Sequence, residues 1–153
     1  MLKHPEISTL EYSPHTYTES HHWLKAAVML SQDSEGFHGN RVYSGYGSKA
    51  NARKYMEDCV MGNVPTFKIP TENRELIFQG WEALCEKYAN PVFFEKSPQI
   101  IAHTAALDLL FEWYQKTRFQ VKFIFLVRNP MAIMYSAPMS CFQPVSYYQL
   151  SLV

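Results

Sequence analysis

Arg128 and Ser136 are the two residues whose types and spacing first suggest chemistry. A run of β-formers at 121–127 ends at Arg128, and Ser136 follows eight residues later in the stretch KFIFLVRNPMAIMYS. Ligands of open α/β sheets bind beyond the carboxyl ends of the strands. A guanidinium offers a planar fork of donors and a hydroxyl adds one more, which together suit a phosphate. The alternative is that Arg128 only marks where the strand meets water and that Ser136 is a surface residue.

A second group of polar residues follows another short apolar run, at 92–94. This run leads into Glu95, Lys96 and Ser97. If the two runs are neighbouring parallel strands, their ends lie roughly 5–10 Å apart, and Lys96 and Arg128 face one crevice. The alternative is that Lys96 is a solvated charge or a partner of Glu95.

Turn signals and apolar periodicity predict the elements that would position these residues. The helix at 72–89 has the clearest pattern, with apolar residues at i, i+3 and i+4, and it ends before Asn90-Pro91. The next helix begins at Pro98, with Ser97 as its cap. Its expected inner face holds Ile101, Ala105, Leu109 and Leu110. We expect strands at 6–10, 92–94 and 121–127, and helices at 20–30, 49–60, 72–89 and 98–116.

The order strand, helix, strand at 92–127 is that of a βαβ unit. It predicts a parallel sheet and the α/β class. We expect one domain over 1–153, with a loop-rich insert at 31–70 and an irregular tail at 137–153.

Composition indicates a globular protein, with 47% hydrophobic and 18% charged residues. Lys+Arg and Asp+Glu both number 14, so the overall charge does not favour nucleic acid as a partner. No apolar run approaches the roughly 20 residues that span a bilayer, so we expect no membrane segment in this chain. The cysteines Cys59, Cys85 and Cys141 are far apart and odd in number, which favours buried thiols.

Three segments resemble the sulfotransferases that use 3′-phosphoadenosine 5′-phosphosulfate (PAPS), in particular the branch of tyrosylprotein and carbohydrate sulfotransferases. HPEISTLE at 4–11 is similar to the segment that follows the family's first helix. EKSP at 95–98 resembles a short strand that ends in Lys before a helix begun by Pro. FLVRNPMAIMYS at 125–136 resembles the motif that binds the 3′-phosphate of the nucleotide.

The resemblance implies a three-layer parallel sheet of the P-loop nucleotide-binding type. It also implies transfer of a sulfuryl group from PAPS, as co-substrate, to a hydroxyl of a carbohydrate or protein. Glu11 would be the catalytic base, and Lys96 would neutralise charge on the departing bridging oxygen. Arg128 and Ser136 would bind the 3′-phosphate. Ser97 would add a hydrogen bond at most.

The family's S-G-T-T-like loop, which binds the 5′-phosphosulfate, is expected just before HPEI, where only three residues stand. The stretch RVYSGYGSKANARK at 41–54 lacks the G-x-x-x-x-G-K-[ST] pattern of a phosphate loop. We therefore expect a fragment of the domain, incomplete at both ends, that binds nucleotide weakly and turns over little. The alternative is a non-catalytic nucleotide-binding or interaction remnant that self-associates through an exposed sheet edge. A complete membrane-anchored eukaryotic form would act in the Golgi lumen, and other forms in the cytoplasm.

A metal site is a further alternative, because five histidines occur within the first 38 residues. They are His4, His15, His21, His22 and His38. None of them forms an HxxxH or HExxH pattern with a supporting acid on a clear helix, and the adjacent His21 and His22 cannot share one helix face. We therefore expect no metal site from the sequence.

Overall fold

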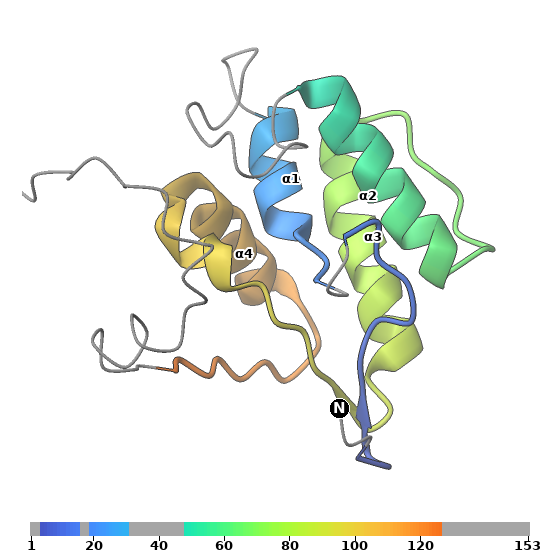
Figure 1. Cartoon of the computed structure of the whole chain (residues 1–153), viewed down its shortest axis with the longest axis vertical. Helices are drawn as coiled ribbons and strands as arrows, with labels where there is room; N and C mark the ends of the chain where they lie inside the picture. Colours follow the sequence, from blue (N-terminus) through green and yellow to red (C-terminus); the bar gives the residue numbers. More distant parts are fainter. Residues whose placement is uncertain (1–3, 16–18, 31–47, 127–153) are drawn as a thin grey trace, which may run out of the picture. The chain divides into compact units, whose positions relative to one another are not determined.

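A computed structural model describes residues 4–15, 19–30 and 48–126 of this chain. The chain divides into two compact units, Met1–Phe119 and Gln120–Val153. No helix in the described ranges is both long enough and apolar enough to cross a membrane. The first unit contains, in order, β1 (Ile7–Ser8), α1 (His22–Leu30), α2 (Lys49–Asn63), α3 (Asn73–Tyr88), β2 (Val92–Phe93), the 3₁₀-helix η1 (Pro98–Ala102) and α4 (Thr104–Lys116) (Figure 1).

β1 and β2 form a two-stranded parallel sheet. Ile7 lies opposite Val92 and Ser8 opposite Phe93. The backbone N–H of Phe94 continues the ladder by donating to the carbonyl of Ser8 at 2.8 Å. The chain between the two strands contains α1, α2 and α3, the kind of long crossover that parallel strands require. The predicted α/β class with a parallel sheet is confirmed in this form, and both predicted strands are present but short.

The predicted strand at 121–127 is wrong over its described part. In the second unit, residues 120–126 form neither helix nor strand, and Ile124 and Leu126 are 71% and 92% exposed. β-propensity measures how well a side chain fits a pleated, half-buried surface. Within the described residues, the only strand pairing is that of β1 with β2, so this apolar run has no such surface.

α1 is the central helix of the first unit. It packs against α2, α3 and α4 (Figure 1), and eight of its nine residues are buried. A helix that is apolar nearly all round is expected to be buried on every side. The hydroxyl of Ser20 accepts a hydrogen bond from the N–H of His22 at 3.2 Å. α1 begins at His22, and the carbonyl of His21 accepts its first intrahelical bond, so the cap position is His21 and not the predicted Ser20.

Aromatic side chains join α1 to its two neighbours α3 and α4. Trp23, Trp81 and Trp113 come from these three helices, and their ring centroids lie 5.4, 6.0 and 6.1 Å apart. The Trp81–Trp113 pair meets edge to face at 90°, an arrangement that aromatic quadrupoles favour. The stripe predicted for the helix at 72–89 is confirmed, because Leu76, Ile77, Trp81, Leu84, Cys85 and Tyr88 are all buried.

The helix predicted at 98–116 is two helices. His103, with φ −131° and ψ 99°, is extended and separates η1 from α4. The break changes the helical phase, so the predicted inner face is wrong as well: Ile101 is 65% exposed and Ala105 is exposed. Ala106 and Trp113 are the buried residues of α4.

Asn63, the last residue of α2, joins the segment after β1 to α2 and α3. Its side-chain oxygen accepts from the N–H groups of Glu11 and Tyr12, at 3.2 and 3.1 Å, and from the hydroxyl of Tyr88 at 2.7 Å. Its amide nitrogen donates to the carbonyls of Tyr12 and Cys59 at 2.8 and 2.7 Å. A buried side chain with five partners leaves several polar groups unpaired when it is removed.

We therefore expect Asn63→Ala to lower the free energy of unfolding by about 2–4 kcal/mol, because two backbone N–H groups and two carbonyls lose a partner. Urea denaturation followed by tryptophan fluorescence measures this change. Asn51→Ala, at an exposed position of the same helix, is the control and should change stability by less than about 0.5 kcal/mol. Equal effects of the two substitutions would contradict the role given to Asn63.

His22 makes the stability of the first unit dependent on pH. Its Nε2–H donates to the carbonyl of Ile77 at 2.8 Å in a fully buried position. Burial lowers the pKa of His22 to about 4, only partly opposed by this hydrogen bond. Between the ordinary histidine pKa and this value, the unfolded chain binds a proton that the folded chain does not bind. Stability is therefore full above about pH 6.5 and falls as the pH is lowered toward 4.

We expect His22 alone to account for roughly 3 kcal/mol of stability lost between about pH 6.5 and 4. His22→Gln keeps a donor for Ile77 but does not titrate, so its stability should fall less steeply over this range. Urea midpoints measured at half-unit pH steps give both slopes. Identical slopes in the two proteins would contradict this assignment.

Candidate functional site

The carboxyl end of β2 meets the segment that leads into α1. Beyond β2, Glu95 accepts three hydrogen bonds at Oε1: from the backbone N–H of Ser20 at 3.2 Å, from the hydroxyl of Ser20 at 2.8 Å and from the hydroxyl of Ser97. These bonds join two segments that are 75 residues apart in the sequence. We call Glu19, Ser20, His21, Glu95, Lys96 and Ser97 the Glu19 cluster.

Glu19 lies at the centre of this cluster. One carboxylate oxygen, Oε1, accepts from the ammonium of Lys96, and the other, Oε2, lies 2.9 Å from Nε2 of His21. The side chain of Glu19 is 6% exposed and that of His21 is 2% exposed, whereas that of Lys96 is 54% exposed. The cluster therefore has a buried anion and an accessible cation.

The surroundings set the charges of Glu19 and His21. Burial by itself raises the pKa of Glu19, but the hydrogen bonds and charges of Lys96 and His21 outweigh it and hold the pKa below its ordinary value. Burial lowers the pKa of His21, and the hydrogen bond that its ring donates to Glu19 opposes this shift only in part. Near neutral pH, a carboxylate at Glu19 therefore faces a neutral imidazole at His21.

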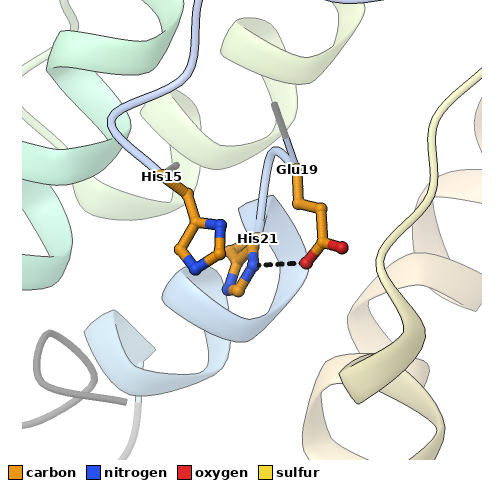
Figure 2. Close-up of side chains that lie close together, drawn as sticks. All are labelled: His15, Glu19 and His21. Atoms are coloured by element: carbon orange, nitrogen blue, oxygen red, sulfur yellow. Dashed lines mark hydrogen bonds and ion pairs between the residues drawn. The ribbon is translucent and has the colours of Figure 1, made fainter. Parts of the chain in front are cut away.

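Polar side chains hold the backbone behind Glu19. The carbonyl of Glu19 accepts from the hydroxyl of Ser13 at 2.6 Å and from that of Tyr55 at 3.3 Å. Ser13 also accepts from the N–H of His15 at 3.0 Å. The ring centroids of His15 and His21 lie 4.3 Å apart. Figure 2 shows the two rings next to each other. His21 has a positive φ of 49°, a left-handed backbone conformation that is uncommon for residues other than glycine.

Of the four site residues predicted from the sequence, the structure describes Lys96 and Glu11, and they lie in different surroundings. Lys96 lies in the Glu19 cluster, although its ion pair is with Glu19 rather than with Glu95. Glu11 lies outside the cluster: its side chain is 72% exposed and pairs with Lys87 at 2.9 Å. Arg128 and Ser136 lie outside the described residues, so their role remains a prediction.

Sequence reasoning missed Glu19, considered His21 only for a metal site that it did not expect, and considered Glu95 only as a partner of Lys96. Glu19 and His21 flank Ser20, which we interpreted only as a helix cap. One signal was present: three polar residues stand directly before a helix that is apolar nearly all round. Such residues are carried toward the interior and need partners there.

Of the four N-terminal histidines that the structure describes, two lie together. His15 and His21 lie near each other and near Glu19. His22 instead bonds to Ile77 in the core, and the Nδ1 of His4 accepts from the N–H of Glu6 at 3.2 Å. His38 lies outside the described residues.

A hollow of about 350 Å³ lies elsewhere, between α3 and α4. Arg74 and Lys116 form ion pairs with Glu112 at its wall. Neither Glu11 nor Lys96 is among the described residues that line it.

No protein-family model matches this chain, and no curated protein or solved structure matches it either. The resemblance of three sequence segments to sulfotransferases therefore remains a prediction. The roles that it implies must be tested by substituting the residues concerned.

The Glu19–Lys96 pair should be coupled more strongly than an exposed ion pair, because Glu19 is buried. In a double-mutant cycle of Glu19→Gln and Lys96→Met, we expect a coupling energy of about 1–2 kcal/mol in the free energy of unfolding. Arg118 and Glu86 form the matched control, since both side chains are more than half exposed. Their cycle should give no more than about 0.5 kcal/mol. Equal couplings would show that burial adds nothing at Glu19.

Proposed function

We propose that this chain belongs to a PAPS-dependent sulfotransferase domain that transfers a sulfuryl group to a hydroxyl of a carbohydrate or protein. The observation that carries the proposal is the pairing of β1 with β2. β1 lies within HPEISTLE, and β2 ends two residues before EKSP, so the pairing brings together two of the three segments that resemble the family. The P-loop-type three-layer sheet, of which this pair would be a part, belongs to the same proposal.

The neighbourhood of Lys96 supports a role for it at the transferred group. Lys96 follows β2 at the carboxyl end, the edge at which α/β folds bind ligands. Its side chain is about half exposed, so an anion can reach it. In the transfer, the acceptor oxygen forms a bond to sulfur while the bond from sulfur to the bridging phosphate oxygen breaks. Lys96 neutralises the charge that develops on this oxygen.

Glu19 suits the role of the base better than Glu11. The base must take the proton that the acceptor hydroxyl loses as its oxygen bonds to sulfur. Glu19 is ionised, buried and in contact with Lys96, whereas Glu11 is solvated and paired with Lys87. When Lys96 turns to the bound nucleotide, Glu19 loses a neighbouring positive charge and a hydrogen bond, while its burial remains. Its pKa then rises, which makes it a stronger base at the moment of transfer.

Arg128 and Ser136 retain the role that the sequence indicates, which is to bind the 3′-phosphate. This role predicts a specific pattern of nucleotide affinity, because adenosine 5′-phosphate lacks the 3′-phosphate and 3′-phosphoadenosine 5′-phosphate (PAP) carries it.

Calorimetric titration of the 153-residue chain with PAP tests the proposal. We expect measurable binding that Lys96→Met and Arg128→Met each weaken by about 10- to 100-fold, the effect of losing one charge-assisted hydrogen bond. Glu19→Gln should strengthen binding, because it removes a negative charge and releases Lys96. For adenosine 5′-phosphate, Arg128→Met should leave the affinity unchanged.

Arg118→Met is the matched control, since Arg118 is an exposed arginine that pairs with Glu86, and it should leave the affinity for PAP unchanged. Equal affinities for PAP and adenosine 5′-phosphate, or no binding of either up to millimolar concentration, would contradict the proposal. PAP binding without release of PAP from PAPS, in the presence of sugar and tyrosyl-peptide acceptors, would instead favour the non-catalytic nucleotide-binding remnant.

A further inference from the structure

His15, Glu19 and His21 each offer one metal-ligating atom, and these atoms all lie within 4.8 Å of one another. Figure 2 shows their arrangement: His15 comes from the loop that follows β1, and Glu19 and His21 come from the segment before α1. Glu19 and His21 are buried and His15 is half-buried. These three residues are therefore potential ligands in a packed part of the first unit rather than surface side chains.

The ligand atoms need to move only a little to bind a metal ion. Tetrahedral zinc with bonds of about 2.0–2.1 Å holds its ligand atoms roughly 3.4 Å apart. Oε2 of Glu19 and Nε2 of His21 already lie 2.9 Å apart. Rotation of the His15 side chain is the main adjustment, because its ring lies 4.3 Å from that of His21 and is tilted by only 31°.

The donor set selects the class of metal. Two imidazole nitrogens and one carboxylate oxygen match the three protein ligands of many zinc sites that keep one position open. Imidazole ligands favour zinc and its neighbours among the transition metals, whereas magnesium and calcium prefer sites made only of oxygen. We propose that His15, Glu19 and His21 form a binding site for Zn²⁺ or a similar divalent transition-metal ion, which displaces Lys96 from Glu19.

Lys96 is the competitor of the ion. Its ammonium pairs with Oε1 of the same carboxylate whose Oε2 lies beside His21, but its side chain is 54% exposed and can turn toward water. Lys25 is a second positive charge nearby, and it lies 4.6 Å above the ring of Tyr55. Both lysines oppose a divalent cation. The affinity should therefore be moderate in the native chain and higher when Lys96 is removed.

Isothermal titration of the chelator-treated 153-residue chain with ZnCl₂ tests this site, and the readout does not depend on sulfuryl transfer. We expect one Zn²⁺ per chain. Affinity should rise several-fold in Lys96→Met and fall at least about tenfold in His15→Asn and in His21→Asn, as each loses one ligand. His4→Asn is the matched control, because His4 is not one of the three proposed ligands, and this variant should bind Zn²⁺ as the native chain does.

Circular dichroism of each variant establishes whether it is folded. If His21→Asn unfolds, the half-buried His15 decides the result. Absorption of the Co²⁺-loaded chain gives an independent readout, because an ordered site of low coordination number produces intense visible bands that His15→Asn should abolish. The proposal is overturned if neither the native chain nor Lys96→Met binds Zn²⁺ stoichiometrically, or if both histidine variants bind as tightly as the native chain. A cobalt–thiolate band, which would place the ion on a cysteine, also overturns it.

Discussion

Burial of α1 on every side is the constraint on which the first unit depends. This nine-residue helix has no solvent-facing stripe, and the polar residues that lead into it are therefore buried as well. Each buried polar group that stays unpaired costs about 1–3 kcal/mol, so these residues need partners from other elements. Ser20 bonds to Glu95 beyond β2 and His22 to Ile77 of α3. The bonds that satisfy the entrance to α1 therefore also hold the carboxyl end of the sheet against the helices.

Local signals were sufficient for α3 but not for the break at His103 or for the sheet. The apolar stripe at 72–89 needs only its own residues to be recognised, and α3 spans almost all of that range. A strand also needs a neighbour. The run at 92–94 has one in β1, whereas the described part of 121–127, which is longer, forms no strand. Pairing between distant segments is not encoded in either run alone.

The same distinction separates Glu19 from Glu11. Both are glutamates in polar stretches before α1, and their sequence neighbours give no reason to prefer either. The difference comes from Lys96, which is 77 residues away from Glu19. Sequence reasoning identified Lys96 from its position after a strand. Its partner could not be identified in this way, because it depends on the folded position of the segment before α1.

The Glu19–Lys96 pair combines an anion fixed by burial with a cation that can leave. An anionic ligand acts by drawing Lys96 away, and a cationic ligand acts by replacing it. Either event leaves the other partner available, since removal of Lys96 exposes a carboxylate and occupation of the carboxylate frees an ammonium. Linkage requires such effects to be reciprocal. An anion bound at Lys96 and a metal ion bound at Glu19 should therefore strengthen each other's binding, provided that both fit at once, and this single ion pair would set the strength of the coupling.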